Sequence, residues 1–160
     1  MLPSDQPAEN RAPHAASPSE LVAAERRLHR VLRNRLNAAV EGLGLSYAQV
    51  EVMLLLDERP NMHASLIARE LDATRQGIHR LVRQLELGGL VDVLPPDVGA
   101  KPITLTRRGR RRLANALDAI DARAVAGLRQ MSEDDRRRAL ETLEECERAL
   151  RPARPRWWFD

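Results

Sequence analysis

The chain has 160 residues, of which 43% are hydrophobic but only 2% aromatic, and its formal net charge at pH 7 is +3. This length fits one domain, with or without extended arms, and the scarcity of aromatic residues and strand-like runs favours a mostly α-helical fold. The N-terminus lacks a signal-like apolar segment, no apolar run approaches membrane-spanning length, and a single cysteine, Cys146, excludes an intramolecular disulfide. We therefore expect a cytoplasmic protein without a membrane partner.

The positive charge is concentrated in the middle of the chain. Residues 59–112 contain eleven Lys and Arg against five Asp and Glu, which gives +6, whereas the rest contains fifteen against eighteen, which gives −3. A local basic excess of this kind favours a surface that faces phosphates. A solvated charged face is the alternative.

Two segments make up the N-terminal part. Residues 1–18 are rich in Pro, Ala and Ser and show no periodicity, which predicts a disordered arm. Residues 19–44 carry apolar side chains at helical spacing and end in two glycines, Gly42 and Gly44. This pattern predicts one long helix.

Three shorter helices are predicted next. The first begins with Ser46 and Gln49 at capping-box spacing and ends before Pro60. The second is predicted over "HASLIARELD", residues 63–72, and the third over residues 74–86. Two short helices in succession, joined by a brief turn, are typical of a helix-turn-helix.

The helix predicted over residues 74–86 has two different faces. Thr74 occupies its N-cap position, and the stripe expected to be buried consists of Ile78, Leu81, Val82 and Leu85. The opposite face is rich in hydrogen-bond donors and has no carboxylate before Glu86; it consists of Arg75, Gln76, Gly77, His79, Arg80 and Arg83. Such a face favours binding to an anion or to a surface lined with acceptors.

A β-hairpin and two further helices are predicted in the second half of the chain. Two short apolar pieces, residues 90–94 and 103–106, flank a loop rich in Pro and Gly, which predicts a hairpin with a loose tip. The following helix is predicted to run on towards Leu128, and a last helix is predicted to open at Ser132. The prolines of the C-terminal tail, residues 151–160, disfavour a helix there.

Two short helices followed by a hairpin is the element order of a winged helix-turn-helix, whose second helix enters the major groove of DNA. The blocks "LSYAQVEVMLLL", "LIARELDATRQGIHRLVRQLELGGLV" and "ITLTRRGRRRL" occur in the order and at the spacing typical of the MarR family of bacterial transcriptional regulators. The chain resembles that family over residues 21–150. The last block is similar to the family's "LTxxG" signature, and "LVRQLELGGLV" is similar to its "LExxGLV" block.

The resemblance implies a domain organisation and a function. Residues 19–44 would form an N-terminal dimerisation helix, residues 45–106 a winged helix-turn-helix DNA-binding lobe, and residues 107–150 the C-terminal dimerisation helices. The implied protein is a homodimer that binds double-stranded DNA at a pseudopalindromic site, with half-sites about 10 to 10.5 bp apart. Repression is the expected direction of regulation, with release by a small phenolic or anionic effector.

Most residues expected to contact DNA lie on the helix predicted over residues 74–86. Arginine suits the acceptors of guanine and glutamine the edge of adenine, whereas Arg83, farther along the helix, is expected to meet only phosphate. The complete set is Thr74, Arg75, Gln76, Gly77, His79, Arg80, Arg83, Lys101 and Arg107. The alternatives are a solvated arginine face on this helix and a solvated charge run over residues 107–112.

Two positions depart from the family pattern. The family usually carries an Asp-x-Arg at the wing tip, whereas the segment "DVGA" that begins at Asp97 has no arginine. Either Lys101 replaces this arginine or the wing makes only backbone contacts. Gly77 stands where the family more often has a small hydroxyl residue, and it lets the helix backbone approach DNA. The missing arginine mildly favours an alternative function, a nonspecific or architectural DNA-binding protein without an effector.

Other candidate sites carry weaker signals. An effector pocket is expected to involve His29, Arg33, Tyr47 and His63, with ordinary surface or interface residues as the alternative. The histidines are scattered and lack partners at ligand spacing, so no metal site is predicted. Neither a nucleophile motif nor a phosphate-cradling glycine loop is present, so we expect no cofactor and no enzymatic activity.

The C-terminal part leaves further questions. Cys146 is expected to pack inertly in the last helix, which disfavours redox sensing. The aromatic residues Trp157, Trp158 and Phe159 are expected to pack within a dimer, with covering of a pocket or contact with another protein as the alternatives. A helical interaction protein that has lost DNA binding is a third reading, and the carboxylate-free donor face of residues 74–86 argues against it.

Overall fold

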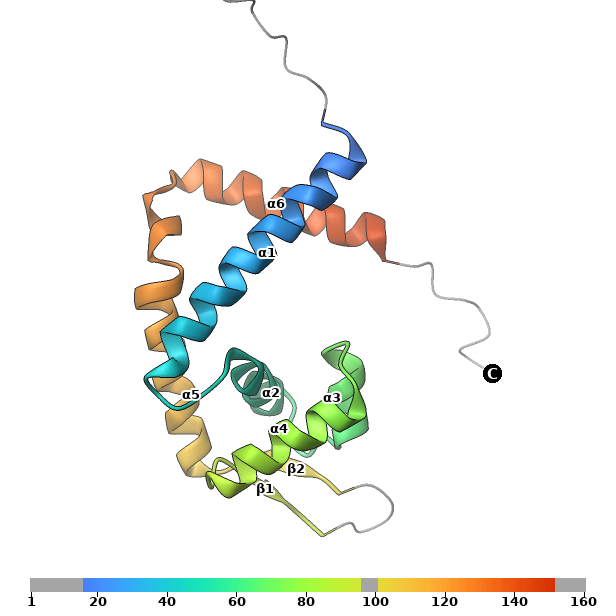
Figure 1. Ribbon diagram of the computed structural model, residues 1–160, viewed down its shortest axis with the longest axis vertical. Helices are drawn as coiled ribbons and strands as arrows, with labels where there is room; N and C mark the ends of the chain where they lie inside the picture. Colours follow the sequence, from blue (N-terminus) through green and yellow to red (C-terminus); the bar gives the residue numbers. More distant parts are fainter. Residues whose placement is uncertain (1–15, 96–100, 152–160) are drawn as a thin grey trace, which may run out of the picture.

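The computed structural model describes residues 16–95 and 101–151, and these ranges are mostly helical, with one two-stranded sheet (Figure 1). The elements in chain order are α1 (Pro18–Glu41), α2 (Tyr47–Glu58), α3 (Ala64–Glu70), α4 (Arg75–Leu87), β1 (Val91–Val93), β2 (Ile103–Leu105), α5 (Arg107–Ala119) and α6 (Glu133–Leu150). The predictions for the N-terminal arm up to residue 15, for the wing tip and for the tail after residue 151 lie outside the described residues. No helix within the described ranges combines the length and apolar character needed to cross a membrane.

Local side-chain chemistry fixes where the helices begin. The predicted capping box of α2 is confirmed, because Ser46 Oγ accepts a hydrogen bond from Gln49 N at 3.3 Å and Gln49 Oε1 accepts one from Ser46 N at 2.8 Å. Thr74, Thr106 and Ser132 cap α4, α5 and α6 by accepting from the backbone N–H of the third helical residue. Each cap satisfies a donor that has no partner inside the helix.

One hydrophobic core joins α2, α3, α4 and the hairpin to Val40 at the end of α1 and to Leu113 and Ala116 of α5. Its least exposed large side chains include Val50, Met53, Leu56, Ile67, Ile78, Leu85 and Val91. The predicted inward stripe of α4 is confirmed for Ile78, Val82 and Leu85, whereas Leu81 is half-buried at the edge of this core. Most of this core lies in residues 45–106, for which we keep the name DNA-binding lobe from the sequence prediction.

The hairpin is tied to the lobe by its second strand. Val91 pairs with Leu105 and Val93 with Ile103 in the antiparallel ladder. Ile103 N also donates to Met62 O at 2.8 Å, in the connection between α2 and α3. The backbone of the wing is therefore fixed on both sides near its base.

The segment after α5 differs from the prediction of a helix running towards Leu128, which is wrong. Helix α5 ends at Ala119, and a π-helical turn (Ile120–Ala124) and a 3-10 helix (Ala126–Gln130) follow. The wider π turn changes the direction in which successive side chains point. It places Ala124 in a small buried cluster with Leu36 and Ala39 of α1.

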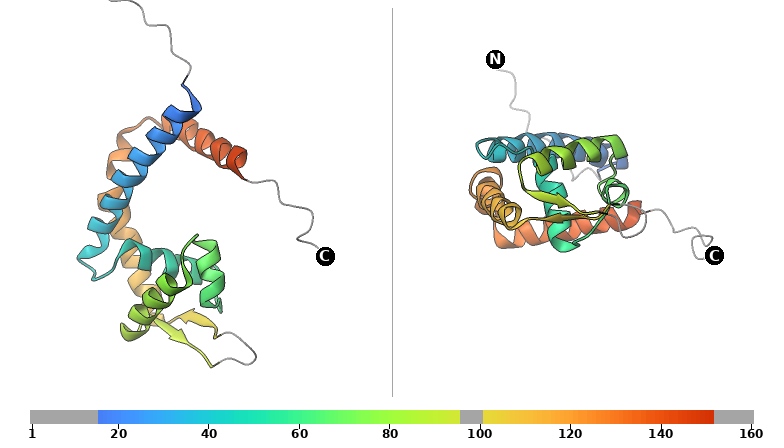
Figure 2. Two further views of the ribbon diagram at one scale, coloured as in Figure 1. Left: turned by 45° about the vertical axis from the view of Figure 1, so that its right-hand side comes forward. Right: turned by 90° about the horizontal axis from the view of Figure 1, so that it is seen from below.

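Helices α1 and α6 extend away from the DNA-binding lobe, and α5 leads from the hairpin towards them (Figures 1 and 2). Only the C-terminal part of α1 has buried residues, namely Leu36, Ala39 and Val40. None of the residues of α6 is buried. Both helices therefore present apolar side chains that the described parts of the chain leave uncovered.

Candidate nucleic-acid interface

Helix α4 is positioned with one face in the core and the other in solvent. Thr74 Oγ1 accepts from Gly77 N at 3.1 Å, and Ile78, Val82 and Leu85 anchor the helix from behind. The side chains of the opposite face are exposed: Arg75, Gln76, His79, Arg80 and Arg83. The sequence prediction of a buried aliphatic stripe behind a donor-rich surface therefore describes this helix correctly.

The arginines of α4 are not neutralised within the part of the chain that the structure describes. Elsewhere arginines pair with carboxylates, as Arg59 does with Glu70 at 2.8 Å. No carboxylate of the described residues lies within ion-pair distance of Arg75, Arg80 or Arg83. The three guanidinium groups remain available to an external anion.

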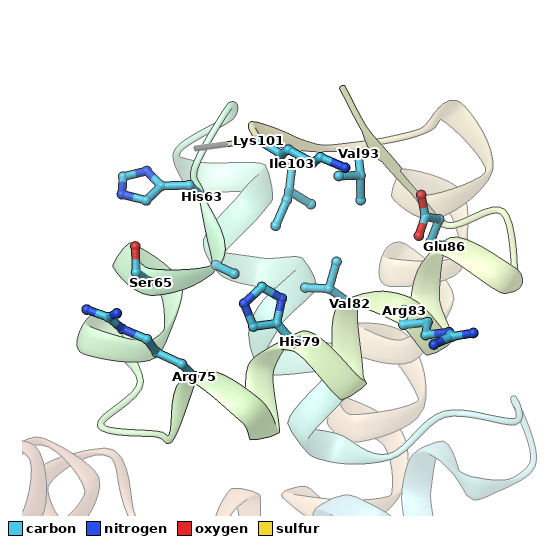
Figure 3. Close-up of a pocket in the computed structure, with 11 residues that line it drawn as sticks. His63, Ser65, Arg75, His79, Val82, Arg83, Glu86, Val93, Lys101 and Ile103 are labelled. Carbon is cyan, nitrogen blue, oxygen red and sulfur yellow. The ribbon is translucent and has the colours of Figure 1, made fainter. Parts of the chain in front are cut away.

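A groove of about 750 Å³ lies between α4, the start of α3 and the hairpin (Figure 3). Its apolar floor includes Val82, Val93 and Ile103, and its polar lining is provided by His63, Ser65, Arg75, His79, Arg83, Lys101 and Glu86. Because most of these polar side chains are donors, the groove has the chemistry of a surface that accepts a phosphate backbone.

The structure brings together only some of the predicted DNA-contact residues. Arg75, His79, Arg83 and Lys101 line the groove. Gln76 and Arg80 are exposed on α4 outside its lining, and Arg107 is exposed at the start of α5. The groove therefore joins part of α4 to the wing, while the remaining candidates surround it.

Sequence reasoning missed two polar side chains of the groove, Ser65 and Glu86, and placed a third, His63, elsewhere. Ser65 lies on α3 beside the groove, and its position in the first helix of a helix-turn-helix was the available signal, because that helix crosses the DNA backbone. His63 was grouped with the effector-pocket candidates, whereas it lies in this groove near His79 (Figure 3).

The start of α5 is held against the hairpin by Thr106 and Gly109. Thr106 Oγ1 accepts from Gly109 N and donates to Gly89 O, both at 2.8 Å, and Thr106 N donates to Leu90 O at 3.1 Å. A Cβ atom on Gly109 would lie 2.0 Å from Leu90 O. Glycine is needed here because the helix touches the strand through its backbone.

The arginine run at the start of α5 lies where the helix dipole disfavours cations. Arg110 Nη1 donates to Leu105 O at 3.1 Å, whereas Arg107, Arg108 and Arg111 are exposed. The first turn contains no acidic residue. These cations surround the base of the wing and are accessible to phosphates beside the groove.

A second, smaller recess of about 180 Å³ lies between α1 and α2. It is lined by His29, Leu32, Arg33, Leu36, Tyr47 and Glu51. The structure therefore unites three of the four effector-pocket candidates and excludes His63 from them. Glu51 was not predicted, because its approach to α1 depends on how the two helices pack.

Burial controls the ionisation of the two α2 side chains in this recess. It raises the pKa of the Glu51 carboxyl, an effect that the positive charges of Arg33 and His29 oppose. Burial also raises the pKa of Tyr47, with a further contribution from the negative charge of Glu51. Tyr47 is fixed in place because its backbone N donates to Asn37 Oδ1 of α1 at 3.0 Å.

The described residues contain no group of three or more His, Cys, Asp or Glu side chains that could hold a metal ion. Cys146 is a half-buried free thiol on α6. The candidate functional features among the described residues are thus the donor-lined groove and the recess. Together with the helix–turn–helix and the hairpin, the groove defines a winged helix-turn-helix protein of the DNA-binding class.

Comparisons with known proteins assign the family. The MarR family model matches residues 43–101. The HTH-type transcriptional repressor Rv2887 of Mycobacterium tuberculosis is 32% identical over 123 residues, which cover 73% of this chain and 88% of Rv2887. The chain therefore belongs to the MarR family of transcriptional regulators, and it is not an enzyme.

Solved structures agree with this assignment. Rv2887 in complex with DNA is 27% identical, with a TM-score of 0.67 over 82% of this chain and 98% of Rv2887. Rv2887 in complex with p-aminosalicylic acid is 28% identical, with a TM-score of 0.67 over 82% and 99% of the two chains. The repressor CouR, bound to a 23-mer DNA duplex, is 26% identical, with a TM-score of 0.68 over 81% and 91%. The mostly helical MarR winged-helix fold predicted from the sequence is confirmed.

Proposed function

We propose that the protein is a homodimeric repressor that inserts α4 of each subunit into the major groove at a pseudopalindromic DNA site, and that a small aromatic acid releases it. The observation that carries the proposal is the exposed donor face of α4, whose arginines have no carboxylate partner among the described residues. Rv2887 and CouR, which share this fold, have been solved bound to DNA, and this supports DNA binding by the chain.

The residues of the interface have different roles in this proposal. Arg75, Gln76 and Arg80, near the start of α4, contact base edges, because their donors match guanine or adenine. His79 contributes a further donor from the groove, and Thr74 meets the DNA where α4 begins. Three cations neutralise phosphates, namely Arg83, Lys101 and Arg107.

Gly77 allows the first turn of α4 to approach DNA closely. A Cβ atom at this position would meet only Thr74 Oγ1, at 3.0 Å, and nothing else within 4 Å. In the proposed complex, the backbone of Gly77 is therefore uncovered on the side of α4 that faces the major groove of DNA. A larger side chain there would stand between α4 and the bases.

The uncovered apolar residues of α1 and α6 support the dimer. They are Leu21, Val22, Leu28 and Val31 on α1, and Leu140, Leu143 and Leu150 on α6, the last of which is 79% exposed. Helices with an apolar stripe require a partner surface, and an 18-residue helix with no buried residue has none in the described parts of its own chain. A second copy that interleaves α1 and the segment from α5 to α6 supplies this surface.

The recess between α1 and α2 is the proposed effector site. Rv2887 has been solved with p-aminosalicylic acid and with salicylic acid, which are small aromatic acids. Arg33 and His29 line this recess and suit a carboxylate. Because α1 belongs to the dimerisation region and α2 to the DNA-binding lobe, a ligand that prefers one packing of the two helices shifts the spacing of the two lobes.

Selection of genomic DNA tests the proposed function. The purified protein is incubated with sheared DNA from its source organism at physiological salt, and the bound fragments are sequenced. A shared palindrome with half-sites one helical turn apart is the expected result. Fragments without a common motif would instead establish nonspecific binding and refute a sequence-specific repressor.

A pair of double variants tests the assignment of α4. Arg75→Ala with Arg80→Ala should abolish binding to the selected site. Arg35→Ala with Arg123→Ala removes the same charge from exposed positions on α1 and the π-helical turn, and should leave specific binding nearly unchanged. If the α4 double variant bound its site as tightly as this control, α4 would not be the DNA-contacting helix.

A further inference from the structure

Glu51 is the one side chain of the effector recess whose charge opposes an acidic ligand. It lies on α2, half-buried beside Tyr47, in the recess that α1 closes. Among the described residues it forms neither a hydrogen bond nor an ion pair, although Arg33 and His29 are close enough to influence its pKa. Glu70, by contrast, is held by Arg59 at 2.8 Å. The carboxylate oxygens of Glu51 are thus free to accept hydrogen bonds. This suggests that a ligand of the recess donates to them.

The recess divides its charges between two helices. The guanidinium of Arg33 and the imidazole of His29 come from α1, and the carboxylate of Glu51 comes from α2. Leu32 and Leu36 provide apolar surface between them. A volume of about 180 Å³ is below the roughly 300–1,000 Å³ of sites for drug-sized ligands, so the recess suits a single ring. A ring bound there meets Arg33 and His29 of α1 and the carboxylate of Glu51 of α2.

We propose that Glu51 determines effector specificity by selecting aromatic acids that carry an amine or hydroxyl donor on the side of the ring opposite to their carboxylate. The carboxylate of the ligand contacts Arg33 and His29, and its donor is accepted by Glu51. This inference rests on the proposed function, because it names the ligand class of the same recess.

The physical reason is the cost of leaving a half-buried carboxylate unpaired. Burial already raises the pKa of Glu51, which means that its ionised form is incompletely solvated in the recess. A ring without a donor removes the remaining water and leaves the charge without a partner. A ring with a donor replaces that water by a charge-assisted hydrogen bond. A binding site that hydrogen-bonds its ligand therefore rejects analogues that lack the donor, because they leave a polar group of the site unpaired.

Calorimetric titration of the full chain with three ring acids tests the proposal. The ligands are 4-aminobenzoate, whose donor is opposite to the carboxylate, salicylate, whose hydroxyl is adjacent to it, and benzoate, which has no donor. Wild-type protein should bind 4-aminobenzoate at least about tenfold more tightly than benzoate, as expected for a hydrogen bond to a charged group. Salicylate should bind more like benzoate.

Variants at two glutamates of α2 provide the comparison. Glu51→Leu should reduce the 4-aminobenzoate to benzoate preference to about one, because the acceptor is gone, and Glu51→Gln should give an intermediate value. Glu58 lies on the same helix but is exposed, so Glu58→Leu should keep the wild-type preference. A preference near one in wild-type protein, or a preference that survives in Glu51→Leu, overturns the proposal.

DNA binding is measured on the same samples, so that two failures are distinguished. Specific DNA binding without any ring-acid binding overturns the role of Glu51 and of the recess, but leaves the repressor intact. If the protein prefers 4-aminobenzoate through Glu51 but shows no specific DNA binding, the ligand class is supported. The proposed function as a sequence-specific repressor is then refuted. Circular dichroism and DNA affinity confirm that each Glu51 variant is folded.

Discussion

Gly109→Ala should destabilise the junction between the wing and α5. The added Cβ atom would lie 2.0 Å from Leu90 O, 3.0 Å from Leu90 C and 3.1 Å from Leu105 Cδ2. Two of these atoms are backbone, so the helix and the strand must separate. Overpacking of this kind costs about 1–3 kcal/mol, and weakening the hydrogen bond from Thr106 N to Leu90 O costs about 1 kcal/mol more.

Helix propensity opposes this loss only in part. Alanine is favoured over glycine by up to about 1 kcal/mol inside a helix, and by less in the first turn. We therefore expect Gly109→Ala to lower the free energy of unfolding by roughly 2–3 kcal/mol. Urea denaturation followed by circular dichroism measures it, at one fixed protein concentration because dimerisation contributes to apparent stability.

Gly42→Ala is the matched control. Gly42 has a φ of −62°, and a Cβ atom there would meet nothing within 4 Å. This variant should be neutral or more stable by up to about 1 kcal/mol, since alanine restricts the unfolded chain. If Gly109→Ala were as stable as wild-type protein, the close approach of α5 to the strand would be refuted. The same conclusion would follow if Gly109→Ala and Gly42→Ala lowered the free energy of unfolding equally.

Three further predictions concern other parts of the molecule. Thr74→Ala should lower stability by about 1 kcal/mol through loss of the α4 cap, measured by thermal unfolding, whereas Thr74→Ser should retain it. Leu140→Glu with Leu143→Glu should convert the dimer to monomer in analytical ultracentrifugation, and a dimer that persists would contradict the role of α6. Burial raises the pKa of Glu51 above its usual 4.5, so its stabilising contribution is complete below the unfolded pKa and lost as pH rises through the folded pKa. Glu51→Gln should therefore gain stability relative to wild-type protein in denaturation curves as the pH rises above the usual pKa of 4.5, and a difference that does not change with pH would contradict this.

Much of the local structure could be predicted because it depends on neighbouring residues in the sequence. The hydroxyl caps at Ser46, Thr74 and Thr106 bond to backbone groups three residues later, so spacing alone reveals them. The aliphatic stripe of α4 follows from helical periodicity in the same way. The end of α5 at Ala119 has no such local signal, because it depends on packing of the next turn against α1.

The candidate site shows the same division. The donor face of α4 follows from the sequence, but the groove depends on how α3 and the hairpin lie beside it. Nothing in the sequence indicated that His63 lies in the groove, with His79, rather than in the recess, with His29. Glu51 escaped notice because an isolated glutamate acquires a role only when Arg33 of another helix is brought close.

The hydrogen bonds of Thr106 make the wing and the start of α5 one mechanical body. A single hydroxyl group links Gly89 at the base of the hairpin to Gly109 on the helix. A tilt of α5 is therefore transmitted to the hairpin through this link. Changing the spacing between half-sites by one base pair rotates the second site by roughly 34–36° about the DNA axis. In the proposed homodimer, a lobe built in this way follows such a rotation only if α5 bends, so we expect specific binding to tolerate little change in the length of the operator.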